Sequence, residues 1–159
     1  MAKQAPPQQP VAVNRKAYHD YFIEEEYEAG IVLTGSEIKS VRAGRVNLRG
    51  AYARAQNGEL WLFDAHISPN DQTGAYFQHE PTRPRKLLLH RREINRLLGK
   101  LEQKGLTLVP LDIHFQSRRA KLKLGVARGK KLYDKREATA ERESQRQLQR
   151  VIKERRYDD

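Results

Sequence analysis

The sequence of 159 residues contains no cysteine. A chain without thiols forms no disulfide framework, no thiolate nucleophile and no zinc finger, and it fits the reducing cytosol. Its five histidines never occur at the short spacings that place two imidazoles on one metal ion. We therefore expect a cytoplasmic protein without a metal site. We also expect no cofactor and no catalytic residues.

Long apolar runs are also missing. No stretch approaches the ~20 apolar residues of a membrane-spanning helix, so we expect no membrane partner. The first residues carry Pro6, Pro7 and Pro10 among glutamines, unlike the charged and then apolar layout of a secretory signal. We interpret residues 1–13 as a flexible leader.

Acidic residues are the minority among the charges. Lys and Arg number 31 against 20 Asp and Glu, which gives a formal net charge of +11 and a pI near 10.0. Such a chain attracts polyanions, and nucleic acid is the expected partner once a membrane is set aside. The length suits one domain with tails, which we place at residues 14–127, followed by a basic tail at residues 128–159.

The first half of this domain predicts strands and one short helix. Tyr18–Ile23 and Ile31–Leu33 are rich in aromatic and branched residues, which favours strands. Thr34-Gly35-Ser36-Glu37 has the pattern of a capping box, and Gly44 is a suitable stop, so a helix is predicted over Thr34–Ala43.

Further along, Asn57-Gly58 is typical of a two-residue β-hairpin turn between strands at Ala51–Ala55 and Leu60–Phe63. Leu87–Leu89 is a brief strand candidate. Apolar residues at helical spacing then predict a helix over Arg92–Lys104, closed by the next glycine.

The last part of the domain predicts two strands. Leu106–Phe115 alternates, but Pro110 shifts the phase by one position, which predicts a bulge. Leu122–Val126 alternates with Lys121 and Lys123, which gives a strand with a basic outer face. The pattern as a whole predicts a mainly β fold: a small antiparallel barrel of the oligonucleotide-binding (OB) type with two or three helices.

The tail holds 11 Lys or Arg and 7 Asp or Glu, a net +4, and very few apolar residues. It has too little apolar surface to fold alone, so we expect it to be disordered when free. Residues 138–156 contain no Gly or Pro, and a helix there would place four cations on one side and Val151 and Ile152 on the other. We interpret the tail as a segment that becomes helical on binding RNA.

Several segments together resemble the SsrA-binding proteins, also called small protein B. The residues that carry the resemblance are Asn14–Ala17, His19–Glu25, Glu28–Ile31, Glu37–Ser40, Arg42–Arg45, His66–Pro69, Arg85–Leu89, Gly129–Lys131 and Asp134–Arg136. Their order and spacing cover nearly the whole chain from Asn14 onward.

The resemblance implies an RNA-binding protein of bacterial trans-translation. In that family an OB barrel grips the tRNA-like domain of transfer-messenger RNA (tmRNA) and occupies the space of the missing anticodon arm. The tail enters the small-subunit decoding centre and the vacant mRNA channel of a stalled ribosome, where it becomes helical. Elongation factor Tu delivers the RNA. We expect the protein itself to be a monomer.

The resemblance also implies binding residues. Asn14, Glu28 and Leu88 match family positions that grip the RNA, although the residues alone favour a core role for Leu88 and an ordinary exposed carboxylate for Glu28. The candidates for the tRNA-like domain are Asn14, Arg15, Lys16, Glu28, Lys39, Arg42, Arg45 and Leu88. The candidates of the ribosome-binding tail are Lys130, Lys131, Tyr133, Asp134, Lys135, Arg136, Arg142, Arg146, Arg150, Val151, Ile152 and Lys153. Tyr133 matches the family's aromatic or histidine position that stacks in the decoding centre.

Two other functions compete with this interpretation. The acidic cluster Glu24, Glu25, Glu26 and Glu28 suggests a metal-dependent nuclease, but no Asp or His completes a ligand set, and charged residues commonly protect the edge of a sheet. A permanently bound structural ribosomal protein with an OB fold is the second alternative.

Overall fold

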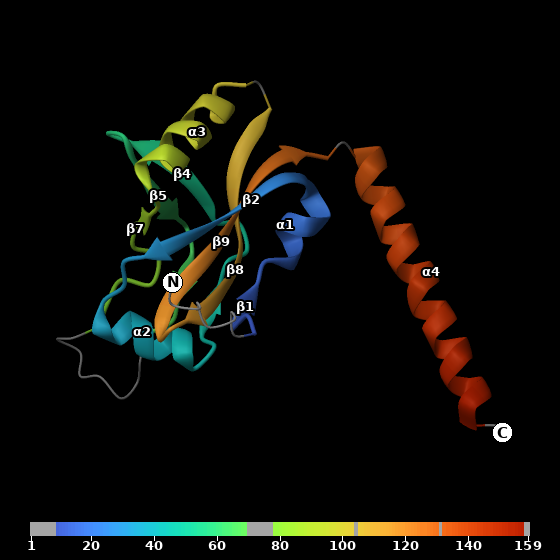
Figure 1. Cartoon of the computed structure of the whole chain (residues 1–159). Helices are drawn as coiled ribbons and strands as arrows, with labels where there is room; N and C mark the ends of the chain where they lie inside the picture. The colour runs from blue at the N-terminus through green and yellow to red at the C-terminus, as the bar shows by residue number, and fades with distance from the viewer. Residues whose placement is uncertain (1–8, 70–77, 104, 131, 158–159) are drawn as a thin grey trace, which may run out of the picture.

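A computed structural model describes residues 9–69, 78–103, 105–130 and 132–157 (Figure 1). In chain order the strands are β1 (Ala12–Val13), β2 (Tyr21–Ile31), β3 (Val46–Asn47), β4 (Tyr52–Gln56), β5 (Glu59–Phe63), β6 (His66–Ile67), β7 (Arg85–Leu88), β8 (Leu106–Gln116) and β9 (Arg119–Gly129). The helices are α1 (Arg15–Asp20), α2 (Gly35–Arg42), α3 (Arg91–Leu101) and α4 (Leu132–Tyr157).

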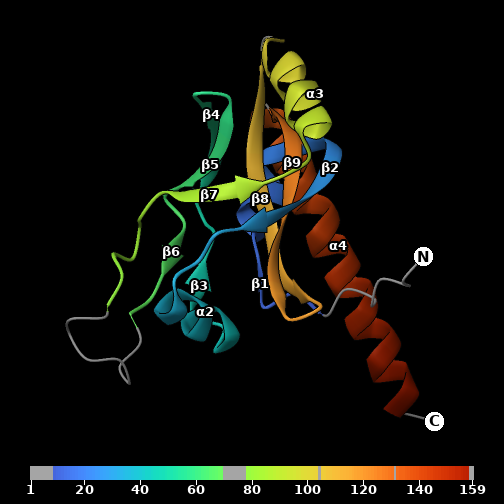
Figure 2. The same ribbon diagram turned by 60° about the vertical axis from the view of Figure 1, so that its left-hand side comes forward.

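The strands form one large antiparallel sheet. Its order is β1-β8-β4-β5-β7-β2-β9, and β9 also pairs with β8. A separate pair is made by β3 and β6. Helices α3 and α2 lie at opposite ends of this sheet (Figure 2). The predicted mainly β architecture is therefore confirmed, with three helices before the tail and a fourth within it in the described residues.

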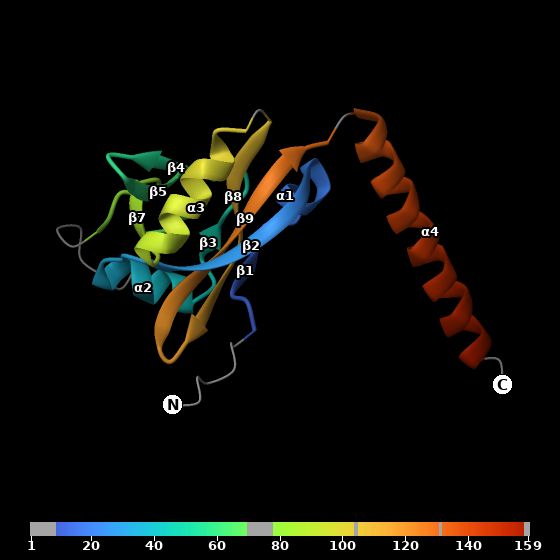
Figure 3. The same cartoon turned by 45° about the horizontal axis from the view of Figure 1, so that its top comes forward.

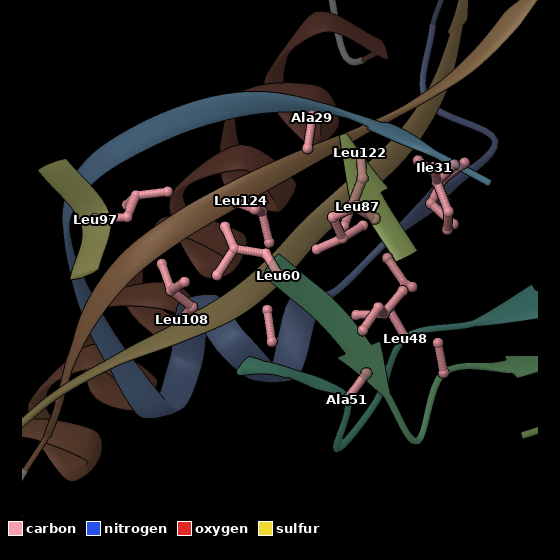
Figure 4. Close-up of a cluster of buried hydrophobic side chains, with 14 of the residues drawn as sticks. Ala29, Ile31, Leu48, Ala51, Leu60, Leu87, Leu97, Leu108, Leu122 and Leu124 are labelled. Carbon is pink, nitrogen blue, oxygen red and sulfur yellow. The ribbon is translucent and has the colours of Figure 1, made fainter. Parts of the chain in front are cut away.

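The core fills the space inside this sheet. Leucines from β5, β7, β8, β9 and α3 point toward one another (Figure 4). Leu60, Leu97, Leu108, Leu122 and Leu124 are all fully buried. Removing one such side chain from water contributes roughly 1.5–3 kcal/mol, so these leucines hold the sheet and α3 together.

The strongest local signals of the sequence are confirmed. Thr34 caps α2 through a capping box with Glu37, and the chain turns away at Gly44 with φ of 73°. Asn57 and Gly58 have φ of 53° and 75°, as the two-residue turn between β4 and β5 requires. These features depend on neighbouring residues alone, and the sequence therefore predicts them well.

The predicted bulge in β8 is also present. Pro110 pairs with Leu124 and Asp112 pairs with Lys123, so Leu111 is the extra residue on its strand. A proline has no backbone N–H to donate to a neighbouring strand. Next to a bulge, where the regular pairing is already interrupted, this missing hydrogen bond is tolerated.

The prediction for the first strand was wrong at its start. Residues 18–20 belong to α1. The buried side chain of Asn14 caps this short helix, because it accepts a hydrogen bond from the Ala17 N–H at 3.2 Å. The strand then runs unbroken over Tyr21–Ile31, whereas residues 32 and 33 lie outside it. The two strands expected from the sequence are one strand.

The domain boundaries need correction at both ends. Ala12 and Val13 pair with β8, and the Val11 N–H donates to the Ile113 carbonyl at 2.8 Å, so residues 11–13 are part of the sheet and no flexible leader. Residues 1–8 lie outside the described residues. At the other end β9 continues to Gly129, two residues past the predicted boundary. We use "body" below for residues 11–130.

Helix α3 runs from Arg91 to Leu101, shorter than the helix predicted to residue 104, which itself lies outside the described residues. The tail follows the body as the long helix α4, which leaves the sheet at the end of β9 and has its N-terminal end next to α1 (Figure 3). Among the described residues, no helix is long and apolar enough to cross a membrane.

Candidate nucleic-acid interface

The sheet presents an open cleft of about 530 Å³ at the end of β7. Its lining residues, here called the Leu88 cleft, are Gly30, Ile31, Val32, Leu33, Ile38, Arg42, Leu88, Phe115, Arg118, Arg119, Ala120 and Lys121. Leu88 is 51% exposed, whereas its neighbour Leu87 is buried in the core. The sequence argument for a core leucine at position 88 was therefore wrong.

Glycine on the neighbouring strand leaves room for Leu88. Gly30 pairs with Leu88 across the sheet. A Cβ atom at position 30 would lie only 3.2 Å from the Leu88 Cβ. Val32, also in the cleft, is 45% exposed. The floor of the cleft is thus an accessible apolar surface of the kind on which nucleotide bases pack.

Cations surround this apolar floor. The Arg42 guanidinium lies over the Phe115 ring, 5.8 Å from its centroid. Ser117 and Arg118 have positive φ and form the two-residue turn of the β8–β9 hairpin, which displays an exposed Arg118. An apolar floor with a basic rim can accept bases and hold backbone phosphates at the same time.

Helix α2 is fixed to the body by a buried ion pair. Glu37 is fully buried and accepts hydrogen bonds from the Thr34 N–H at 2.9 Å and from Arg83 and Arg85. Arg85, also fully buried, donates to the Ala65 carbonyl at 2.8 Å. Burial opposes ionisation of Glu37, but these hydrogen bonds outweigh it and lower its pKa.

The fixed helix exposes two of the predicted cations. Lys39 and Arg42 lie on the open side of α2, and Arg45 is exposed in the turn after it. Only Arg42 lines the Leu88 cleft. The basic surface expected from the sequence is therefore present on and beside α2.

Glu28 lies on the outer face of β2 in a second cavity of about 370 Å³. Its Oε1 is 3.4 Å from His114 Nε2, and His114 Nδ1 is 2.8 Å from the Asp112 carboxylate. His114 and Asp112 are almost fully buried, whereas Glu28 is exposed. Glu28 is therefore an accessible acceptor whose orientation a buried pair supports.

The other carboxylates of this strand make ion pairs. Glu24 is 3.1 Å from Arg128, and Glu26 is 3.9 Å from Lys123, both on β9. β2 pairs with β9 along most of its length but with β7 only at Gly30 and Ile31, so the acidic stretch has a strand partner on one side only, as the expectation of edge protection requires. The described residues contain no group of three His, Cys, Asp or Glu that could hold a metal ion.

Asn14 differs in geometry from the other candidates. It is only 4% exposed, and its amide donates to the Pro110 carbonyl at 2.8 Å and to the Leu48 carbonyl at 3.2 Å. Its polar atoms are therefore used within the body. Arg15 and Lys16, the next two residues, are exposed on α1. Asn14 serves to hold α1, and its neighbours present the charge.

The junction of β9 and α4 contacts α1 and β2 through several candidate residues. The Lys130 N–H donates to the Asp20 carbonyl at 2.8 Å, and its ammonium lies 5.1 Å from the centroid of the Phe22 ring. Lys135 Nζ is 3.6 Å from the Asp20 carboxylate. Tyr133 and Asp134 lie in the first turn of α4, whereas Lys131 lies outside the described residues.

The rest of α4 is open. The candidate residues that are exposed along it are Arg136, Arg142, Arg146, Arg150, Val151, Ile152 and Lys153. Val151 and Ile152 are 45% and 53% exposed, which is unusual for branched apolar side chains. They form an apolar surface with no partner among the described residues of the body.

The sequence interpretation missed several residues of these sites. Phe115, Arg118 and Arg119 line the Leu88 cleft, and His114 with Asp112 supports Glu28. A signal for the first group exists, because two arginines separate two alternating apolar runs, as residues of an exposed hairpin turn do. The second group gives no such signal, since its contact depends on strand pairing.

Comparisons with known proteins agree on one family. The family described as "SmpB protein" matches residues 11–154. An "SsrA-binding protein" of Roseiflexus sp. (strain RS-1) is 67% identical over 145 residues, covering 91% of this chain and 92% of that protein. One of Chloroflexus aurantiacus (strain ATCC 29366 / DSM 635 / J-10-fl) is 66% identical over 148 residues, covering 93% and 92%.

A solved structure is similar as well. It is described as "tmRNA-SmpB: a journey to the center of the bacterial ribosome", with a TM-score of 0.66 and 53% sequence identity, covering 85% of this chain and 95% of that chain. The family match extends over the body and into the tail. The chain therefore belongs to the SmpB protein family.

Proposed function

We propose that this chain binds the tRNA-like domain of tmRNA and enables the rescue of stalled ribosomes by trans-translation, as a binding protein and not as an enzyme. The observation that carries the proposal is a family match that spans residues 11–154, so that body and tail match together. No observation favours the alternative of a permanent structural ribosomal protein.

The body supplies the RNA contacts in this proposal. Bases of the tRNA-like domain pack on the Leu88 cleft, and phosphates meet the cations of α1 and α2. Glu28 accepts hydrogen bonds from a base amino group or a 2′-hydroxyl, which a carboxylate does well where phosphates are turned away. The exposure of Leu88 and the buried support of Glu28 favour these roles.

The sheet in this proposal is a barrel of the OB type. Neighbouring strands pair in the order β8-β4-β5-β7-β2-β9, and the β8–β9 pairing returns to the starting strand. A sheet that pairs back onto itself in this way leaves few open edges. OB folds often bind oligonucleotides, which is consistent with the proposed RNA.

The tail acts inside the ribosome in this proposal. Helix α4 corresponds to its bound form, in the vacant mRNA channel beyond the decoding centre. A free helix of this kind has little support, because it is exposed beyond its first turns and carries arginines at four-residue spacing, Arg142, Arg146 and Arg150, each such pair costing about 0.2–0.5 kcal/mol. Elongation factor Tu joins through the RNA, and the protein acts as a monomer.

The test is to pull the affinity-tagged protein from a bacterial lysate and to sequence the RNA that it carries. We expect tmRNA to be the main RNA recovered, with far fewer ribosomes than protein molecules in the sample. Enrichment of ribosomal RNA alone, with one copy of the protein on every ribosome of unstressed cells, would overturn the proposal in favour of a structural ribosomal protein.

A further inference from the structure

A third cleft, of about 440 Å³, lies between the body and the tail. Its lining residues, here called the α1–α4 cleft, are Val13, Asn14, Arg15, Lys16, His19, Asn47, Arg49 and Arg142. These come from β1 and α1, from β3 and the segment after it, and from α4. Four of them are Lys or Arg, and no carboxylate is among them.

Specific contacts hold the tail at this position. His19 Nε2 is 3.0 Å from the Thr139 hydroxyl, and His19 Nδ1 is 3.0 Å from the Asp20 carboxylate. Lys135 Nζ approaches the same carboxylate at 3.6 Å. The hydrogen bond with His19 is the main reason that the pKa of Asp20 is lowered, with a smaller contribution from the charge of Lys135. Asp20 therefore stays ionised and anchors the first two turns of α4.

This anchor brings like charges together. Arg142 lies three residues after Thr139, and hence on the same side of the helix, so the anchor turns it toward the cations of α1. Arg49 is positioned from the body side, because its backbone N–H donates to the Asn47 side chain at 2.9 Å. Cations from two parts of the chain face one open space, and their mutual repulsion favours an anion between them.

We infer that the α1–α4 cleft binds a phosphate of an RNA backbone, held jointly by Arg49 of the body and Arg142 of the tail. This inference rests on the proposed RNA-binding function and adds a site to it. Because Arg142, one of the four cations of the cleft, belongs to the tail, the site is complete only when α4 is docked on α1. An RNA strand bound here therefore fixes the direction in which the tail leaves the body.

Two RNAs supply the same chemistry, the tmRNA and the ribosomal RNA, so the test has two arms. The variants are Arg49→Gln, Arg142→Gln and the double variant. The control is Arg96→Gln on α3, which removes one positive charge, as each single variant does. The first arm measures affinity for tmRNA over a series of salt concentrations. The second measures binding of the preformed protein–tmRNA complex to ribosomes stalled on a message without a stop codon.

We expect each single variant to weaken binding about three- to tenfold in one arm, with the slope of log K against log salt reduced by about 1. The double variant should be little weaker than either single variant, because the two arginines share one phosphate and their losses are not additive. The arm that shows this pattern identifies the RNA. The Arg96→Gln control should bind as the wild type does.

Fully additive losses in the double variant, or wild-type binding by all three variants in both arms, would overturn the inference. A wild-type protein that fails to bind tmRNA would instead overturn the proposed function, so the two failures are distinguishable. As a second measurement, His19→Ala releases the tail from α1, so it should abolish the effect of Arg142→Gln and most of the effect of Arg49→Gln, because the two arginines share one phosphate. An unchanged effect of Arg142→Gln in that background would also contradict the shared site.

Discussion

Leu87 and Leu88 are adjacent on β7 and have opposite environments, the first 2% and the second 51% exposed. We predict that Leu88→Ala lowers the affinity for tmRNA about tenfold, because it removes an apolar contact surface. Its effect on the free energy of unfolding should stay within about 0.5 kcal/mol. Leu87→Ala is the matched variant and should cost about 2–5 kcal/mol of stability. RNA titrations and urea unfolding of both variants check the pair, and an unfolding loss at Leu88 equal to that at Leu87 would contradict the assignment.

Glu37 supports a second prediction about single residues. Its pKa is lower in the folded protein than in the unfolded chain, so its contribution to stability is present above an unfolded pKa of about 4.3 and is lost as the pH falls through the folded value. We predict that Glu37→Gln destabilises the protein by on the order of 3 kcal/mol at pH 7, because it leaves the buried Arg85 without its counter-charge. The gap between variant and wild type should narrow below about pH 4.

Urea unfolding from pH 7 to pH 3 measures that gap, with Glu102→Gln at an exposed position as the control. A gap that stays constant over this range would show that the charge of Glu37 contributes nothing.

The environments of two single residues could not be predicted from the sequence pattern. Three leucines in a row, at positions 87–89, carry no alternation, and only pairing with Gly30 decides that Leu88 faces outward. The support of Glu28 by His114 likewise joins residues 86 positions apart. The candidates at positions 28 and 88 were therefore reached by resemblance and could not be reached from periodicity.

At the scale of elements, the tail can be separated from the body. Because β9 ends at Gly129 and Lys130 still contacts α1, a chain cut after Lys130 should fold fully. We predict that it keeps tmRNA affinity within about tenfold of the wild type, the loss of Arg142 included, and loses peptide tagging altogether. Filter binding and an in vitro tagging reaction measure the two properties. An equal loss of both would refute this division between body and tail.

The exposed apolar pair of α4 gives another prediction. Val151→Gln combined with Ile152→Gln should reduce tagging at least tenfold, because the pair has no partner in the body and needs one on the ribosome. Glutamine is a better helix former than valine or isoleucine, so a loss of tagging cannot come from a weaker helix. Circular dichroism checks that helix content is kept, and normal tagging by this variant would mean that the pair has no role.

Short elements with complete local signals were predictable, and others were not. Helix α2 and the hairpin at Asn57-Gly58 each follow from a few adjacent residues. Helix α1 has six residues, and its cap is an asparagine that also bonds distant carbonyls, so the aromatic residues beside it suggested a strand. The pairing of residues 11–13 with β8 depends on a contact about 100 positions away.

For the whole molecule, the charge distribution predicts a salt dependence. If the five cations proposed on α1 and around α2 each neutralise one phosphate, log K should fall against log salt with a slope of about −4 to −5. Binding should stay measurable at high salt, because the apolar contact at Leu88 is not screened. Affinities for tmRNA at several salt concentrations check this, and a slope near zero would exclude phosphate contacts by the body.

The pairing of β2 with β9 has a consequence for how the protein is made. Residue 21 pairs with residue 129, so the sheet cannot assemble until residues 21–129 have all been synthesised. Contacts between such distant positions slow folding. The segment after β9 leaves the ribosome later than β9 does, and it gives that strand the length of chain needed to reach its partner during biosynthesis.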